Sequence, residues 1–593
     1  MTTNNITSIK FELIQSIQDL SQRGLFIGSK WASEQLNGLI SSNSTTEDVN
    51  TMSTVTSYQQ TLNQKSNPVL GSDNHIKYLL AKNYFDLKEY RRCADILSSE
   101  YTSTCQLNLF LRSYALYLAI EKRKEEEIIE NASLINEQQQ KINEQQAQQA
   151  QQQSQQPSNI PQLKLDQQQS QEFNDLFKVY NNRYLNSNSS SNSVTVEPLD
   201  AFNLYLYALL LKKQNNFLKS KQVLLQSIQL YPGNWSAWYD LASLCTDYDQ
   251  VMKLVLPNHF IKDFFLAHVS LEFQKNNEAL QIYQSLSKVF SASTYILSQT
   301  AIGNYNLRAF DTGEELFEKL MEIEPNRLEN IDIYSNILYV RDKKAALSML
   351  AHKAMNIEKY CPETCCIIGN YYSLKSEHEK AILYFQRALK LNDKYLSAWT
   401  LIGHEFLEIK NVPSAIRAYR KAVDINPRDY RAWYGLGQTY VLLKLPLYSL
   451  HYFKKATTLR PYDPRMWCAT AGCYEHIDKL PEAIKCYERA EENFDHERVA
   501  QAKLAKLYQE IQNYDKAAYY YKKNLQHYDS EKIDGQEVID ALLYLANHCR
   551  NTNKLSQSEK YCLRLLDYAG PEKEEAKSIL REIHNKSKSI NNF

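Results

Sequence analysis

Three tryptophans at one spacing constrain the fold of this chain more than any other feature. Trp399, Trp433 and Trp467 stand 34 residues apart. After each one comes a small apolar step, then an aromatic residue, then a second aromatic farther along. A fixed period of this length indicates a repeat architecture, because each repeat is one supersecondary unit. The sequence therefore predicts a stack of similar helix-turn-helix units.

The residue types at the repeated positions suit closely packed helix pairs. Trp399, Ile402, Gly403 and Phe406 fall at i, i+3, i+4 and i+7, so they share one helical face. Proline ends the second helix of two units, because it lacks an N–H group and clashes with the preceding turn. We expect the packing frame to consist of Trp399, Gly403, Tyr419, Ala422, Pro427, Trp433, Gly437, Phe453, Ala456, Pro461, Trp467 and Tyr487.

A 34-residue period with this residue order is typical of the tetratricopeptide repeat. We therefore predict an all-α fold, a right-handed superhelical solenoid of helix-turn-helix repeats whose first helices line a concave groove. The phase gives consecutive units from about residue 362 to residue 529, with weaker units on both sides. Weaker outer units are expected, because they act as caps.

Phase and composition divide the chain into seven segments. They are an N-terminal helical segment and polar linker (1–66), N-terminal repeat-like helices for dimerisation (67–125), a disordered Gln/Asn/Ser-rich insertion (126–198), degenerate units (199–330), a regular array (331–534), a repeat-like cap (535–585) and a tail (586–593). The insertion has too little apolar surface to offset the entropy of ordering. We interpret it as an expanded loop, with a glutamine-rich self-association tract as the alternative.

Charge and cysteine usage exclude several classes of protein. The chain has 68 basic and 68 acidic residues, which argues against nucleic acid as a partner. Its 11 cysteines form no C-x-x-C pair, so we expect free thiols in a reducing compartment rather than a metal site. There is no signal peptide and no 18-residue apolar run. We therefore expect no membrane contact and a location in the nucleus and cytoplasm.

No set of residues predicts catalysis. A phosphate-binding G-x-x-x-x-G-K-[ST] loop is missing. Gly435 and Gly437 resemble the start of a dinucleotide fingerprint, but a third glycine and a preceding strand are missing. His404 and Glu405 begin like the zinc motif H-E-x-x-H, yet Glu408 stands where the second histidine should be. We expect neither enzyme activity nor a cofactor.

A binding function remains. The ninth position of each unit should face the groove, and it is polar in four successive units: Asn336, Asn370, His404 and Gln438. All four side chains donate and accept hydrogen bonds, so they can hold an extended peptide by its backbone. Arg431, Tyr434 and Arg465 are expected on the same face, where the arginines suit a carboxylate. The alternative is that this face is polar only because it is solvated.

Residues between the repeat positions carry a more specific resemblance. The stretches that carry it are 23–25, 30–32, 80–90, 363–374, 384–392 and 428–440. In these stretches the chain resembles the subunit 8 family of the anaphase-promoting complex, also called the cell division cycle protein 23 family. Cys365, Cys366, Arg428, Asp429 and Gln438 belong to these stretches but not to the general repeat pattern.

The resemblance implies a non-catalytic scaffold subunit of a multisubunit ubiquitin ligase that controls mitotic progression. It also implies homodimerisation through the N-terminal repeats, contact with other repeat subunits and with the large scaffold subunit, and docking of a substrate-recruiting coactivator of the WD40 type. A standalone peptide adaptor, such as a chaperone cofactor, is the alternative. That mode needs lysines in the groove, but Asp332 and Cys366 occupy the positions. The repeat region of a glycosyltransferase or phosphatase is a weaker alternative, since no catalytic domain follows residue 585.

Overall fold

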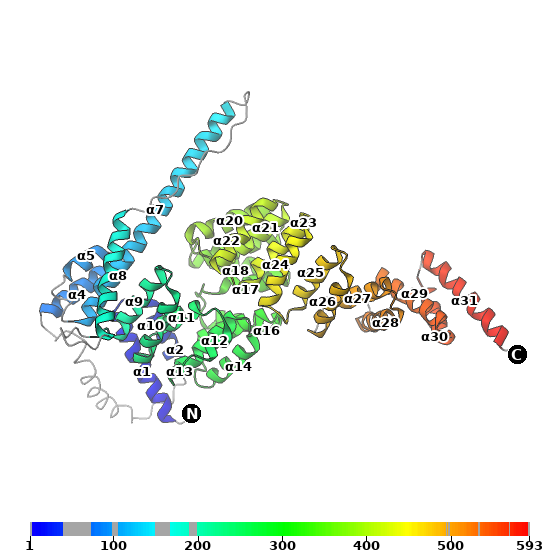
Figure 1. The fold of residues 1–593 in the computed structure, drawn as a ribbon, viewed down its shortest axis with the longest axis horizontal. Coiled ribbons are helices and arrows are strands. Elements are labelled where there is room, and N and C mark those ends of the chain that lie inside the picture. Colours follow the sequence, from blue (N-terminus) through cyan, green and yellow to red (C-terminus); the bar gives the residue numbers. More distant parts are fainter. Residues whose placement is uncertain are drawn as a thin grey trace. The chain divides into compact units, whose positions relative to one another are not determined.

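The computed structural model describes residues 3–39, 73–97, 105–148, 167–188, 198–493, 495, 498–531, 534–568 and 570–590. These residues form 29 α-helices and no strand, and most helices pack in consecutive pairs (Figure 1). The all-α repeat fold is therefore confirmed. Among the described helices, none combines the length and apolar character needed to cross a membrane.

The chain divides into two compact units, residues 1–325 and 326–593, close to the predicted start of the regular array. The helices of unit 1 are α1 (Thr3–Gln22), α2 (Phe26–Gly38), α4 (Asp73–Asp86), α5 (Tyr90–Ile96), α7 (Gln106–Gln148), α8 (Gln167–Asn188), α9 (Ala201–Lys213), α10 (Phe217–Leu230), α11 (Trp235–Leu244), α12 (Tyr248–Met252), α13 (Phe260–Glu272), α14 (Asn276–Ser287), α15 (Thr294–Asn306) and α16 (Phe310–Ile323). One large apolar core joins α1 and α2 to the helices from α7 to α15.

Unit 2 consists of seven helix pairs and a final helix. They are α17 (Ile331–Val340), α18 (Lys344–Ile357), α19 (Pro362–Leu374), α20 (His378–Leu391), α21 (Leu396–Glu408), α22 (Val412–Ile425), α23 (Tyr430–Leu442), α24 (Pro446–Leu459), α25 (Pro464–Glu475), α26 (Leu480–Glu492), α27 (Val499–Glu510), α28 (Tyr514–Glu531), α29 (Gln536–Asn551), α30 (Leu555–Leu565) and α31 (Pro571–Ile590). Each odd-numbered helix from α17 to α29 is the first of a pair, and together they form what we call the first-helix face.

One turn conformation shows how far the repeat register extends. In each pair from α13–α14 to α27–α28, a residue with left-handed backbone follows the first helix, two residues before the second helix begins. These residues are Gln274, Arg308, Asp342, Ser376, Lys410, Lys444, Asp478 and Gln512, each 34 positions after the one before. The next N–H bonds a carbonyl in the last turn, as Asn411 does to Phe406 at 2.8 Å, which is the Schellman closure of a helix. The exact register therefore runs back to residue 274.

The predicted disordered insertion at 126–198 is wrong for its described part. Residues 106–148 are helical in α7, whose second half extends away from the other helices of unit 1 (Figure 1), and residues 167–188 form α8. Leu176 and Tyr180, four residues apart on α8, are buried in the core of unit 1. Averaging composition over the whole segment concealed this short apolar face. Residues 149–166 and 189–197, like the predicted linker at 41–66, lie outside the described residues.

Candidate functional site

The three tryptophans that mark the repeat also form hydrogen bonds to the backbone of the turns between units. The indole N–H groups of Trp399, Trp433 and Trp467 each donate to the carbonyl oxygen six residues earlier, at 2.7, 2.8 and 2.7 Å. In the last two units that carbonyl belongs to Pro427 or Pro461. The prolines thus end the second helix and also accept the bond that positions the next first helix.

Glycines in the first helices make room for aromatic rings of the second helices. A Cβ atom on Gly437 would lie 2.4 Å from Phe453, and one on Gly403 would lie 2.6 Å from Tyr419. A Cβ on Gly435 would also meet the Tyr419 ring, at 2.4 Å. Tyr419, Ala422, Phe453, Ala456 and Tyr487 are buried, as the packing frame requires.

The polar side chains at the ninth position of successive units are more buried than expected. Asn370 is 3 % exposed, and its Nδ2 donates to Asn336 Oδ1 at 2.7 Å and to Ser335 Oγ at 2.8 Å. Asn336 is buried as well. These two amides bond each other across α17 and α19 instead of facing solvent freely. The ninth position of a unit therefore lies partly against the neighbouring first helix, and peptide binding by this pair stays a prediction.

His404, the ninth residue of the following unit, has a neutral imidazole ring. Its Nδ1 is hydrogen bonded to the hydroxyl of the buried Tyr419 at 2.8 Å. Burial, assisted by the positive charge of Arg431, lowers the pKa of His404 to about 4. The adjacent Glu405 is buried and binds Ser373 at 2.6 Å and His378 at 2.9 Å. The sequence does not reveal this bridge between α19, α20 and α21, because its residues do not recur with the repeat period.

Two partly exposed arginines are fixed by aspartates that also cap their helices. Arg431 Nε lies 3.0 Å from Asp429 Oδ1, and Arg465 contacts both carboxylate oxygens of Asp463 at 3.2 and 2.8 Å. The same aspartates accept the backbone N–H of the arginines, at 3.1 Å in both cases. The two arginines therefore stand in equivalent positions one repeat apart. Tyr434 lies within hydrogen-bonding reach of Gln438, which is partly exposed.

A carboxylate clamp of the chaperone-cofactor kind has no place in α17 and α19. Asp332 and Cys366 are both buried at the positions where that clamp needs lysines. Burial raises the pKa of Asp332, which is hydrogen bonded by Tyr395 and Ser397. The described residues also contain no group of histidines, cysteines or carboxylates that could hold a metal ion.

In unit 1, the corresponding face is covered by the chain itself. Trp31 of α2 is 4 % exposed and contacts three successive first helices. Its ring stacks on Trp235 of α11 at 4.3 Å and meets the edges of Phe264 of α13 at 5.2 Å and Tyr295 of α15 at 6.1 Å. Gly38, at the end of α2, lies so close to α15 that a Cβ would be 2.6 Å from the Cα of Ser293. The hairpin of α1 and α2 thus occupies this face of unit 1.

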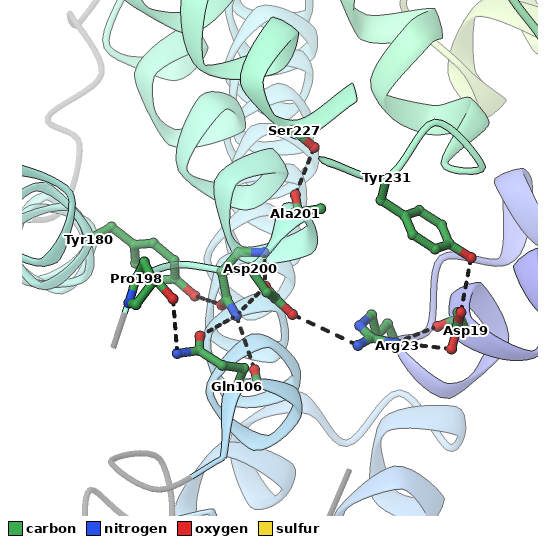
Figure 2. Close-up of polar contacts among 10 residues, drawn as sticks. Asp19, Arg23, Gln106, Tyr180, Pro198, Asp200, Ala201, Ser227 and Tyr231 are labelled. Atoms are coloured by element: carbon green, nitrogen blue, oxygen red, sulfur yellow. Dashed lines mark hydrogen bonds and ion pairs between the residues drawn. The ribbon is translucent and has the colours of Figure 1, made fainter. Parts of the chain in front are cut away.

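A buried polar network fixes α1 in the same unit (Figure 2). Arg23, 3 % exposed, lies 3.9 Å from Asp19 and 3.8 Å from Asp200, and its guanidinium covers the Phe202 ring. Tyr231 donates to Asp19 at 2.9 Å. Burial raises the pKa values of both aspartates, while the charge of Arg23 opposes that rise. The arginine therefore joins α1 to the start of α9.

A second part of the network joins α7 and α8 to α9. Asn203 donates to the carbonyl of Gln106 at 3.0 Å and accepts from Tyr180 at 2.8 Å. Gln106 in turn donates to the Pro198 carbonyl at 3.4 Å (Figure 2). Tyr180 and Asn203 are fully buried, so each needs the bonds that the other supplies. These contacts explain why α8 is ordered within unit 1.

Comparison with known proteins identifies the family. Residues 8–301 match the family described as anaphase promoting complex subunit 8 / Cdc23, and residues 362–395 and 403–444 match tetratricopeptide repeats. The chain is 67% identical to anaphase-promoting complex subunit 8 of Dictyostelium discoideum, over 98% of this chain and 99% of that protein. The chain belongs to the anaphase-promoting complex subunit 8 / Cdc23 family. This is a family of non-catalytic repeat subunits.

Other relatives of the subunit 8 / Cdc23 family agree along the chain. Subunit 8 of Arabidopsis thaliana is 45% identical over 96% of both chains, and subunit CDC23 of Saccharomyces cerevisiae is 31% identical over 68% of this chain and 70% of its own. The crystal structure of the APC/C hetero-tetramer Cut9-Hcn1 aligns with a TM-score of 0.55, covering 95% of this chain and 98% of that chain. At 14% identity, this likeness shows the fold alone.

Proposed function

We propose that this protein is a scaffold subunit of an anaphase-promoting complex, the multisubunit ubiquitin ligase that controls mitotic progression. The observation that carries the proposal is the 67% identity to a subunit 8 across nearly both whole chains. The architecture supports it, since stacked helix pairs present long surfaces to partners. The protein is expected in both the nucleus and the cytoplasm.

The proposed partners divide between the two units. The N-terminal repeats form a homodimer, and the helix stack contacts other repeat subunits and the large scaffold subunit. The WD40-type coactivator docks on the first-helix face of unit 2. Partly exposed Arg431, Tyr434, Gln438 and Arg465 support this choice, because two of them are held in place by buried aspartates. Preorganised side chains lose less entropy on binding.

Purification of the tagged, full-length protein from its own cells tests the assignment. Mass spectrometry should recover the other subunits of the complex in comparable amounts. Recovery of the protein without any of them would contradict the scaffold function. Light scattering should give about twice the chain mass of 69.1 kDa, and a mass of one chain would refute the homodimer.

Coactivator docking is tested by combining Arg431→Gln with Gln438→Ala. Because both side chains are partly exposed, the fold should survive, and coactivator affinity should fall by about tenfold. Arg417→Gln on α22 is the matched control, since its only described bond is to the nearby Ser414. Equal affinity in the double variant and the control would move the docking site away from α23.

A further inference from the structure

A cleft near the C-terminal end of unit 2 contains none of the residues proposed to contact the coactivator. It has a volume of about 1280 Å³ and is lined by α27, α28 and α29. The last turn of α27, the turn into α28 and one side of α29 form its walls. This volume exceeds the range of about 300–1,000 Å³ that is usual for small-molecule sites. A segment of polypeptide suits the space better.

Aromatic side chains line one wall of this C-terminal cleft. Tyr521 of α28 and Tyr544 of α29 have ring centroids 4.5 Å apart, and His548 stacks on Tyr544 at 6.3 Å. Tyr521 is mostly buried, and its hydroxyl donates to Gln509 at 3.0 Å, which fixes both side chains. Such a wall offers apolar area that costs little side-chain entropy to use.

Carboxamides surround the aromatic wall. Gln509 and Gln512 stand on one side, and Asn547 and Asn551, one helical turn apart on α29, stand on the other. A carboxamide both donates and accepts hydrogen bonds, so it matches the N–H and C=O groups of an extended backbone. Amides on two opposing walls suit a peptide that runs between them.

The charges of the cleft define the side chain that it accepts. Its walls include the carboxylates of Glu510, Asp515 and Asp540, against one lysine, Lys506. Asp515 lies 3.8 Å from His548, whereas Glu510 and Asp540 have no ion pair with a basic side chain among the described residues. Uncompensated carboxylates attract cations and repel phosphate. Nucleic acid, phosphopeptides and acidic tails are therefore poor ligands.

We infer that this cleft binds an extended peptide segment of a partner protein that carries arginine or lysine. The peptide backbone pairs with the carboxamides, its aliphatic parts cover Tyr521 and Tyr544, and its basic side chain reaches Glu510 and Asp540. The cleft also borders the first helices α27 and α29, but it contains none of the four residues proposed to contact the coactivator, which are Arg431, Tyr434, Gln438 and Arg465. It adds a second docking site, and it does not depend on which complex the chain enters.

Fluorescence anisotropy with the full-length protein tests this inference. The probe is a fluorescein-labelled peptide in which arginine alternates with leucine, and its control has citrulline in place of arginine. Citrulline keeps the shape of the side chain and removes its charge. The wild-type protein should bind the arginine peptide about tenfold more tightly, and high salt should reduce that preference. Equal binding of the two peptides would overturn the inference.

Variants locate the effect in the cleft. Glu510→Gln with Asp540→Asn should abolish the preference for arginine and leave the affinity for the citrulline peptide unchanged. Asp424→Asn with Glu492→Gln removes two exposed carboxylates elsewhere in unit 2 and should keep the preference. Asn551→Ala should weaken both peptides by a similar factor, because it removes a backbone contact. Loss of the preference in the control pair, or its retention in the cleft pair, would refute the site.

Discussion

The two units use the same helix pairs but treat their first-helix faces in opposite ways. In unit 1, Trp31 and its hairpin cover α11, α13 and α15 with aromatic contacts. In unit 2, the side chains named above on that face are mostly amides and arginines, together with the neutral His404. Burial of large aromatics favours a permanent contact, whereas fixed polar groups favour exchangeable partners. The repeat alone therefore does not determine whether a face is available.

The strongest challenge to this contrast is removal of the hairpin's anchor. Trp31→Ala should destabilise unit 1 by about 3–5 kcal/mol, because a large buried ring is lost and a cavity remains. Hydrogen exchange should accelerate in α11, α13 and α15 and stay unchanged in unit 2. Unchanged exchange in unit 1 would mean that α2 does not stabilise α11, α13 and α15. The first-helix faces of the two units would then not differ in the way described.

A second prediction concerns packing inside unit 2. Gly437→Ala should destabilise the α23–α24 pair by about 1–3 kcal/mol, because the new Cβ would lie 2.4 Å from Phe453. Gly472 is the matched control, since a Cβ there meets no atom within 4 Å. Gly472→Ala should stabilise α25 by about 0.5–1 kcal/mol, because alanine favours helix over glycine. Thermal melts that shift in the same direction for both variants would contradict this packing.

A third prediction concerns the hydrogen bond between Asn336 and Asn370 on the first-helix face of unit 2. Asn370→Ala removes the donor that satisfies Asn336 and Ser335, so the α17–α19 contact should weaken by about 1–3 kcal/mol. Urea unfolding of unit 2 checks the value. Gln438→Ala, at a partly exposed position, should change stability much less. Equal effects would mean that Asn370 is no more structural than its solvated counterpart.

The smallest effect is expected from pH. The folded pKa of His404, about 4, lies below its unfolded value of about 6.5. The unfolded chain therefore takes up a proton first, and stability from the neutral ring, present above pH 6.5, is lost as pH falls towards 4. Because His404 is partly exposed, we expect a loss of about 1–2 kcal/mol. His404→Gln should flatten this part of the stability profile, and the exposed His352→Gln should not.

Periodicity predicted much of the fold and less of the site. The repeat positions foretold the buried Gly437 and Tyr419 because packing imposes the period. The position of Trp31 depends on contacts between residues more than 200 positions apart, such as Trp31 with Trp235. No period in the sequence indicates such contacts. The burial of Asn336 and Asn370 was missed because helical position alone does not separate the open face from the neighbour-facing edge. Tyr180 was hidden by the polar residues around it.

The left-handed residues from Gln274 to Gln512 make this stretch modular. A cut before Lys410 and another before Lys444 would begin and end at the same point of the same turn. The segment between them can be duplicated or removed without creating a new kind of junction, since the chain enters and leaves it in one conformation. Adding or removing one 34-residue segment at this turn would therefore keep the register of all the units that follow.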